Sequence, residues 1–510
     1  MQKVGEKMKK LNAATISRYL FPVIALGIIL LNPFSDQPLV NKMIAVVVWM
    51  AGWWISEAVP IAITSLLPLI LFPLLGIMDG GSTAVQYIND IIFLFIGGFI
   101  LSLAMEKWDL HLKIAFRTLL FFGSKPYRIL LGFMAASSLL SMWMSNTATA
   151  ILMLPIAISV ITEMEHIHGK EKMVKFKIAL LLSVAYACSI GGITTLIGTP
   201  PNLVFAAIFS NLYPDAEVIT FSTWFIFVFP IYLILIFSAS LVLFFLFRPK
   251  IDSVVTFRTY IKEENEKLGR STREQKIVML IFSLFALALI LRSDIVIGDF
   301  RIAGWSNLFP EPGFVKDGTV AVFFAVLLFL IPSKNKKGAQ LMDWTTAVKL
   351  PWSIILLFGG GFALARGSVE SGMTHWISEG LVQYADAPPL VFIGINTFLM
   401  AFLTEFTSNV STTQILLPVV AGMSESLLLN PKFLMIPVTI ASSLAFMLPI
   451  ATPPNAIIFG SKQLRIKDMI LPGFILNILG IIVVTLVMYF WGLHLFDIDL
   501  TVFPEWALEK

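Results

Sequence analysis

Two short motifs centred on asparagine lie within long apolar stretches of the chain. They are Ser145-Asn146-Thr147 and Ser408-Asn409-Val410. The first is at the centre of residues 129–162, a run of 34 residues without a charged side chain. Hydroxyl, amide and backbone carbonyl oxygens are ligands for hard cations, and the NH2 group of asparagine can donate to an anion. The two triplets therefore indicate sites where a small cation and an anion bind together.

Each triplet is followed by the sequence Thr-Pro-Pro-Asn, at residues 199–202 and 452–455. Two prolines in tandem break an apolar helix, because proline lacks the N–H donor and clashes with the preceding turn. We therefore expect unwound backbone at residues 198–202 and 452–455, with free carbonyl oxygens for a cation and helix N-termini for an anion. No lysine or arginine occurs in the four motifs, so helix dipoles and bound cations must offset the charge of an anion. This predicts that a dianion binds together with sodium.

The two halves of the chain repeat these features in the same order. LFIGGF begins at Leu94 and LFGGGF at Leu357, each upstream of its triplet. The glycine motifs, the triplets and the prolines that follow the triplets are all 263 residues apart, and the two Thr-Pro-Pro-Asn motifs are 253 residues apart. Three features at one spacing indicate an internal duplication. The glycine clusters themselves predict close contacts between helices.

Composition predicts that the chain lies in a membrane. It has 510 residues, of which 57% are hydrophobic and 13% charged, and its mean hydropathy is +0.86. Such values lie outside the range of soluble domains and predict an all-α polytopic membrane protein. The formal net charge of +4 is small and gives no reason to expect a nucleic-acid partner. The single cysteine, Cys188, excludes an intrachain disulfide framework and a metal site built on cysteines.

Loop lysines and arginines predict the orientation of the helices, because they favour the cytoplasmic side. As one helix, the 34 residues of 129–162 would be about 51 Å long, against a hydrocarbon core of about 30 Å, whereas two full spans need about 40 residues. Residues 129–162 are therefore predicted to form a re-entrant hairpin that opens to the cytoplasm. The matching hairpin, residues 388–424, is predicted to open to the outside.

This topology has about eleven transmembrane helices and two re-entrant hairpins in two inverted-topology repeats. The predicted units are an N-terminal cytoplasmic segment with the first helix (1–42), a first repeat (43–247) with a broken helix (178–214), a cytoplasmic linker (248–276), a second repeat (277–491) with a broken helix (433–461), and an external C-terminal tail (492–510). Inverted repeats with broken helices are typical of secondary transporters. We expect a plasma membrane, a bacterial inner membrane, with the N-terminus in the cytoplasm.

The paired Ser-Asn triplets and Thr-Pro-Pro-Asn breaks resemble those of the divalent anion/sodium symporter family over nearly the whole chain. The resemblance implies a homodimer in which a transport domain moves against a scaffold by an elevator motion. It implies that substrate contacts Ser145, Asn146, Thr147, Ser408, Asn409, Val410, Thr452 and Pro453. It also implies one sodium site at Ser141, Ser145, Asn146 and Gly198, and a second at Thr404, Thr407, Asn409 and Ala451. Val410 departs from the family pattern, because many dicarboxylate carriers have a hydroxyl there.

The predicted function is sodium-coupled symport of dicarboxylates of the succinate, malate and fumarate type, with sodium as the coupling ion and no cofactor. A sodium-independent dicarboxylate exchanger and a sodium-coupled carrier of citrate or sulfate stay open as alternatives. No nucleophile elbow or zinc motif indicates an enzyme, and hairpins that open on opposite sides fit alternating access better than a channel. Glu405 is equally compatible with coupling a proton or cation and with supporting the second hairpin tip through hydrogen bonds.

Overall fold

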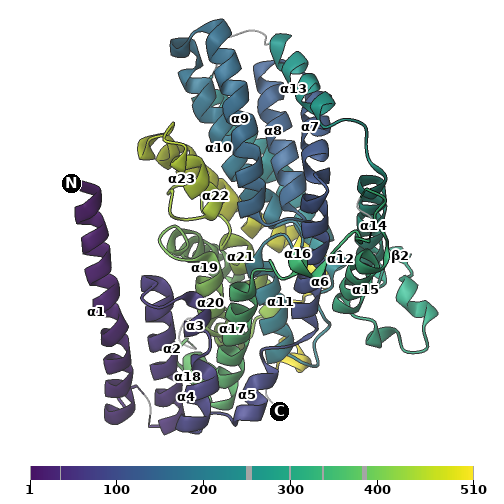
Figure 1. Ribbon diagram of the computed structural model, residues 1–510. Helices are drawn as coiled ribbons and strands as arrows, with labels where there is room; N and C mark the ends of the chain where they lie inside the picture. Colours follow the sequence, from purple (N-terminus) through teal and green to yellow (C-terminus); the bar gives the residue numbers. More distant parts are fainter. Residues whose placement is uncertain are drawn as a thin grey trace.

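The chain folds into a bundle of helices (Figure 1). The computed structural model describes residues 2–34, 36–248, 255–297, 300–335, 338–381 and 388–508. Two short strands, β1 (Ile295–Ile297) and β2 (Phe300–Ile302), pair in antiparallel fashion. The all-α fold predicted from the composition is confirmed.

The first half of the chain supplies twelve of the helices within the described residues. They are α1 (Gln2–Leu31), α2 (Pro38–Ser56), α3 (Ile61–Thr64), α4 (Leu67–Leu75), α5 (Gly80–Val85), α6 (Asp90–Lys107), α7 (Leu110–Phe122), α8 (Pro126–Ser141), α9 (Asn146–His168), α10 (Lys170–Gly192), α11 (Pro200–Leu212) and α12 (Phe221–Leu246). The first hairpin is α8 followed by α9, and it extends beyond residues 129–162 at both ends. α10 and α11 are the two parts of the first broken helix.

The second half contains the corresponding elements. Its α-helices are α13 (Val255–Lys267), α14 (Arg273–Ile290), α15 (Asp317–Leu330), α16 (Trp344–Ala347), α17 (Trp352–Glu370), α18 (Met373–Leu381), α19 (Pro389–Leu403), α20 (Asn409–Ser426), α21 (Pro431–Ala441), α22 (Pro453–Gly460), α23 (Ile466–Val487) and α24 (Leu493–Leu495). Short 3-10 turns cover Trp305–Leu308, Pro312–Phe314 and Glu505–Ala507, and a π-helical turn covers Met488–Gly492. α19 and α20 form the second hairpin, and α21 and α22 the second broken helix.

Eight helices among the described residues are long and apolar enough to cross a membrane. They cover Ala14–Leu31, Pro38–Ser56, Gly80–Lys107, Asn146–His168, Lys170–Gly192, Phe221–Leu246, Trp352–Glu370 and Ile466–Leu495. Shorter apolar helices cover Ile61–Leu75, Asp317–Leu330, Pro389–Leu403 and Pro431–Ala441.

The helix breaks lie earlier in the chain than we expected. α10 ends at Gly192 and α11 begins at Pro200, so the unwound residues are 193–199. In the second half the unwound residues are 442–452, and α22 begins at Pro453. The expected unwinding at 198–202 and 452–455 is therefore wrong in position. Proline is favoured at the first position of a helix, because its missing N–H has no helical partner there and its fixed φ suits the helix.

Glycines allow close approach between helices, as their clusters predicted. A Cβ atom on Gly97 of α6 would lie 2.5 Å from the carbonyl carbon of Ala321 in α15. A Cβ atom on Gly360 of α17 would lie 2.6 Å from the carbonyl oxygen of Ser65. Real Cβ contacts are longer than this, so larger residues at Gly97 or Gly360 would force the backbones apart.

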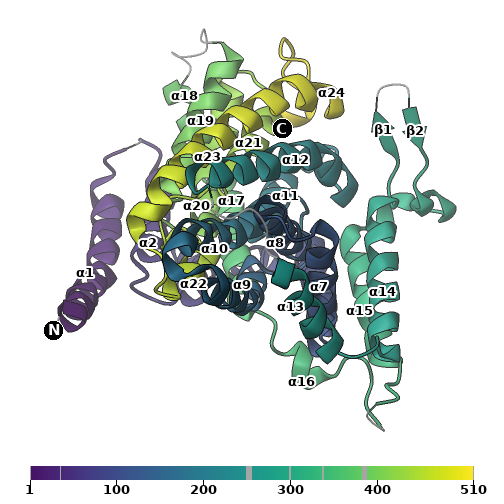
Figure 2. The same ribbon diagram turned by 90° about the horizontal axis from the view of Figure 1, so that it is seen from above.

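The hairpins and broken helices pack together at the centre of the fold. The α8–α9 hairpin packs on α10, and the α19–α20 hairpin packs on α21. In addition, α9 contacts α22 and α20 contacts α11. Figure 2 shows this group between α1 at one edge and α14 and α15 at the other. Each hairpin thus contacts the broken helix of both halves, and this brings the four motifs into one region.

Candidate functional site

The first hairpin tip is a four-residue turn, residues 142–145, between α8 and α9. Ser145 caps α9, and its Oγ accepts a hydrogen bond from the backbone N–H of Ala148 at 3.1 Å. Ser141, the last residue of α8, donates its hydroxyl to Oδ1 of Asn146 at 2.5 Å. The tip therefore places a hydroxyl oxygen and an amide oxygen side by side at the start of a helix.

The second tip repeats this arrangement. Thr404 donates its hydroxyl to Oδ1 of Asn409 at 2.5 Å, and its Oγ1 also lies 2.8 Å from the carbonyl oxygen of Ser442. A hydroxyl has one proton and can satisfy only one of these acceptors at a time. Oγ1 of Thr404, Oδ1 of Asn409 and the carbonyl oxygen of Ser442 therefore lie close together with one proton among them. Thr404 is fully buried. A hard cation can bind to such a group of oxygens.

Neutral oxygens are the available cation ligands in this region. Within the part of the chain that the structure describes, no group of three His, Cys, Asp or Glu side chains could hold a metal ion. The first tip packs against the unwound backbone: a Cβ atom on Gly198 would lie 3.0 Å from the carbonyl oxygen of Ser141 at the end of α8. A Cβ atom on Gly192 would lie 2.5 Å from Oδ1 of Asn146. Ser141, Asn146 and Gly198, three residues of the predicted first sodium site, therefore lie together.

The remaining residues of the predicted sodium sites have other contacts. Ser145 uses its hydroxyl oxygen as the cap of α9. Thr407 contacts its own hairpin, since its Oγ1 lies 2.6 Å from Oγ1 of Thr412 and 2.8 Å from the carbonyl oxygen of Leu403. Ala451 lies at the end of the second unwound stretch, and its N–H donates to the carbonyl oxygen of Leu448 at 3.2 Å. The structure thus joins Thr404 and Asn409 directly. Thr407 lies between them in the chain, Ala451 lies in the second unwound stretch, and both have hydrogen-bond partners of their own.

The predicted substrate residues lie at the starts of three helices, α9, α20 and α22. Ser408 and Thr452 occupy the cap positions of α20 and α22, and Oγ1 of Thr452 accepts from the N–H of Asn455 at 3.3 Å. Thr147 and Val410 are half-buried in the first turns of α9 and α20, and Pro453 is exposed at the first position of α22. Helix N-termini carry free N–H groups and partial positive charge, which favour anions. α9 contacts α22, which also contacts α10, and α20 contacts α11, the continuation of the same broken helix. The three helices therefore belong to one packed region.

Glu405 is a buried carboxylate that differs from its counterpart in the first half, where Met142 occupies the corresponding position. Its oxygens accept from the backbone N–H groups of Met447 and Leu448, both at 2.9 Å, and from Nδ2 of Asn477 at 2.7 Å. The amide oxygen of Asn477 in turn accepts from the N–H of Phe446 at 3.2 Å. These contacts favour the supporting role for Glu405, because the carboxylate holds the unwound backbone of the second broken helix.

The two unwound stretches differ in exposure. Residues 193–199 are all buried, and Thr199 is 4% exposed. In the second stretch Ile450 is 70% exposed, and Pro453 after it is also exposed. The second unwound stretch therefore reaches the surface of the chain, whereas the first is enclosed.

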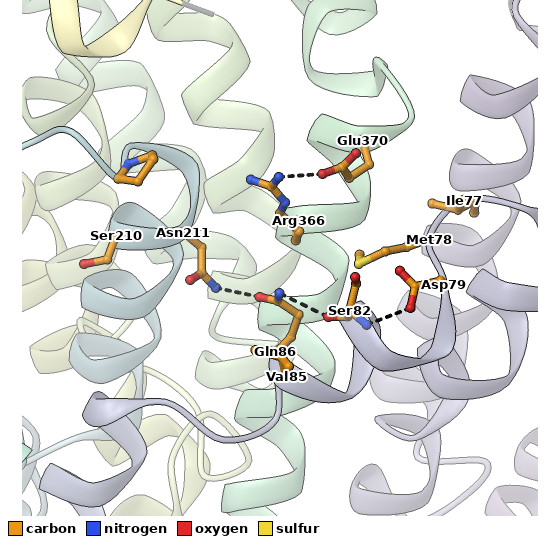
Figure 3. Close-up of a pocket in the computed structure, with 11 residues that line it drawn as sticks. Ile77, Met78, Asp79, Ser82, Val85, Gln86, Ser210, Asn211, Arg366 and Glu370 are labelled. Carbon is orange, nitrogen blue, oxygen red and sulfur yellow. Dashed lines mark hydrogen bonds and ion pairs between the residues drawn. The ribbon is translucent and has the colours of Figure 1, made fainter. Parts of the chain in front are cut away.

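A separate cavity of about 590 Å³ lies between α5, the end of α11 and α17 (Figure 3). Its lining includes the ion pair of Arg366 with Glu370 and the hydrogen bond from Asn211 to Gln86. Asn211 lies nine residues after Asn202 on α11, which places the cavity about 14 Å along the helix from the Thr-Pro-Pro-Asn motif. The cavity thus lies away from the hairpin tips.

Sequence reasoning missed several residues that the fold brings to the site. These are Ser442, whose carbonyl oxygen joins the second oxygen group, Asn477, which holds Glu405, and the motif asparagines Asn202 and Asn455, which hold the unwound backbone. The Thr-Pro-Pro-Asn repeat was a usable signal for the last two. Ser442 and Asn477 lack a comparable motif, because only packing brings them near the hairpin tip.

Curated proteins of known name resemble the chain over most of its length. A sodium-dependent dicarboxylate transporter SdcS of Staphylococcus saprophyticus is 41% identical over 465 residues, which cover 90% of this chain and 87% of the relative. SdcS of Staphylococcus aureus is 40% identical over 454 residues, which cover 88% of this chain and 85% of the relative.

Solved structures share the fold at low sequence identity. The YdaH transporter of Alcanivorax borkumensis aligns with a TM-score of 0.54 at 13% identity, over 84% of this chain and 90% of that one. MtrF of Neisseria gonorrhoeae aligns with a TM-score of 0.55 at 12% identity, over 83% of this chain and 84% of that one. Residues 13–498 match the family described as the sodium:sulfate symporter transmembrane region. With this match along almost its full length, the chain belongs to the sodium:sulfate symporter family.

Proposed function

We propose that the chain is a secondary active transporter that couples the uptake of dicarboxylates, of the succinate, malate and fumarate type, to sodium. The observation that carries this proposal is the duplicated pair of a hydroxyl and an asparagine oxygen at the two hairpin tips, 2.5 Å apart in each. The names of the staphylococcal relatives, sodium-dependent dicarboxylate transporters, support the substrate class. The coupling ions are sodium, and the mechanism needs no organic cofactor.

Sodium and substrate binding can be linked through the two asparagines. In each tip the hydroxyl proton lies between two oxygens, so a cation that uses both oxygens as ligands must displace that proton to another acceptor. Once Oδ1 of Asn146 or Asn409 faces a cation, its NH2 group is directed to the opposite side of the amide, where it can donate to a carboxylate. The N-termini of α9 and α20 then add N–H donors and positive dipole ends to the same anion. Sodium binding thus prepares the site for a dianion.

Alternating access by an elevator motion follows from this proposal. The hairpins and broken helices pack on each other and form the moving unit, and the remaining helices form the scaffold within a homodimer. The proposed location is a bacterial plasma membrane, with the N-terminus in the cytoplasm and the C-terminus outside.

Uptake of labelled succinate into proteoliposomes tests the proposal. Purified protein is reconstituted, and uptake is measured with an inward sodium gradient or with potassium in its place. We expect uptake that requires sodium and is competed by malate and fumarate. Flux that ignores sodium but requires internal dicarboxylate would instead establish an exchanger. Stronger competition by citrate or sulfate than by malate would change the substrate class while keeping the sodium sites.

A further inference from the structure

The last residues of the two Thr-Pro-Pro-Asn motifs make the same set of contacts in both halves of the chain. Asn202 and Asn455 are the third residues of α11 and α22, and both side chains are fully buried. Neither lies in a hairpin tip. Their contacts are with the unwound backbone that precedes each helix.

Each side-chain amide holds two or three backbone carbonyl groups of that unwound stretch. Nδ2 of Asn202 donates to the carbonyl oxygens of Thr195 at 2.7 Å, Ile193 at 3.1 Å and Gly192 at 3.3 Å. Nδ2 of Asn455 donates to the carbonyl oxygens of Ala445 and Leu448, both at 3.0 Å. Gly192 and Ala445 are 253 residues apart, as are Thr195 and Leu448, and this is also the spacing of the two asparagines. We call this set of hydrogen bonds from one asparagine side chain to the preceding unwound backbone a clamp, and the chain contains it twice.

The orientation of each amide is set by these carbonyl groups. A reversed amide would place its own oxygen against carbonyl oxygens, which cannot donate. In both residues the remaining Oδ1 is buried without a hydrogen-bond partner among the described residues. A buried polar atom without a hydrogen-bond partner carries a free-energy cost. Asn202 and Asn455 occupy corresponding positions in the two halves, and both leave Oδ1 without a partner. This repetition indicates that the clamp has a function in the site and is not a packing detail of one helix.

The clamped backbone lies directly against the first hairpin tip. A Cβ atom on Gly192 would be 2.5 Å from Oδ1 of Asn146, and a Cβ atom on Gly198 would be 2.5 Å from the carbonyl oxygen of Gly192. The alpha carbon of Gly192 thus packs against the amide group whose oxygen we propose as a sodium ligand, and the carbonyl oxygen of Gly192 packs against Gly198. In the second half, the clamped residues 445–448 include the N–H groups of Met447 and Leu448 that Glu405 holds from the other side.

We propose that Asn202 and Asn455 are the positioning residues of the two cation sites: each amide fixes the unwound backbone that completes the oxygen group at a hairpin tip. This inference rests on the proposed function. The ligand whose affinity the clamps set is sodium, and Asn202 serves the first tip while Asn455 serves the second. Their direct effect is on the cation, and the effect on the dicarboxylate follows only through coupling.

The substitutions Asn202→Asp and Asn455→Asp test the inference, because they keep the size of the side chain but replace the donor group with an oxygen. Succinate uptake into proteoliposomes is measured against sodium concentration. We expect the half-saturating sodium concentration to rise about tenfold or more in each variant, which corresponds to about 1.4 kcal/mol. At saturating sodium the apparent KM for succinate should change by less than about threefold. A direct loss of substrate contacts worth the same free energy would instead raise this KM about tenfold.

Asn41→Asp is the matched control. Asn41 is also fully buried, in α2, where its Nδ2 donates to the carbonyl oxygen of Gln37 at 3.4 Å and its Oδ1 accepts from the N–H of Phe34 at 3.0 Å. It should lower thermal stability without a change in sodium dependence. If an aspartate variant does not fold, the alanine variants are used, with sodium-dependent thermal stabilisation of the purified protein as the measurement.

Three outcomes separate this inference from the proposed function. Wild-type sodium dependence in the folded Asn202 and Asn455 variants would overturn the positioning role while sodium-coupled uptake stands. A shift of the same size in Asn41→Asp would also overturn it, since the effect would then reflect general loss of stability. Wild-type uptake that needs no sodium would refute the proposed function itself, before any variant is compared.

Discussion

Replacing Thr404 by valine tests the oxygen group of the second hairpin tip with little change in shape. Oγ1 of Thr404 lies 2.5 Å from Oδ1 of Asn409 and 2.8 Å from the carbonyl oxygen of Ser442. Valine keeps the branched side chain at this fully buried position but removes the only oxygen that links the two acceptors. The variant therefore changes the chemistry of the tip while its packing is retained.

The expected effect follows from the number of hydrogen bonds lost. The hydroxyl has one proton, so one buried acceptor loses its donor, at a cost of about 1–3 kcal/mol. If Oγ1 is also a sodium ligand, the cation-bound state loses a contact to a charge, about twice as strong as the neutral hydrogen bond lost in the sodium-free state. The net loss of sodium affinity is then about 1–3 kcal/mol. A change of 1–3 kcal/mol corresponds to a rise of about 5- to 150-fold in the half-saturating sodium concentration. The maximal rate at saturating sodium should fall less.

Sodium titrations of succinate uptake measure this effect, with Thr439→Val as the matched control. Thr439 is equally buried on α21, but its hydroxyl donates at 2.8 Å to the carbonyl oxygen of Met435 in its own helix. The control should keep the wild-type sodium dependence. If Thr404→Val and Thr439→Val have the same half-saturating sodium concentration, the Thr404 hydroxyl is not a sodium ligand and the reasoning fails.

Four further substitutions address the other parts of the site. Asn146→Ala and Asn409→Ala should each abolish uptake in a folded protein, checked by size-exclusion profile; normal uptake in both would contradict the site. Val410→Thr adds a hydroxyl in the first turn of α20 and should shift competition among dianions more than sodium dependence; an unchanged substrate profile would argue against contact with substrate. Glu405→Gln replaces a carboxylate that accepts from Met447, Leu448 and Asn477, and should lower the free energy of unfolding by about 2 kcal/mol. Wild-type stability in chemical denaturation would exclude the supporting role.

The amino-acid sequence alone predicted the features that depend on composition and on residues close together in the chain. Apolar runs without charge predicted the helices. The equal spacing of the triplets, the glycine motifs and the prolines that follow the triplets predicted the duplication. The contact between Ser141 and Asn146, with its counterpart between Thr404 and Asn409, spans only five residues. A turn between two helices brings such residues together without help from the rest of the fold, so a motif can predict the pair.

Tertiary packing decided the exact breaks and the residues that support the tips. The prolines marked the breaks, but the unwound backbone lies before them, where Asn202 and Asn455 hold carbonyl groups up to ten residues away. Ser442 and Asn477 reach the second tip from 38 and 72 residues away. Contacts across such separations depend on how helices pack, and packing is determined by side-chain shape and burial over the whole bundle. The sequence by itself therefore determined which oxygens the site offers, and the tertiary structure decided what holds them in place.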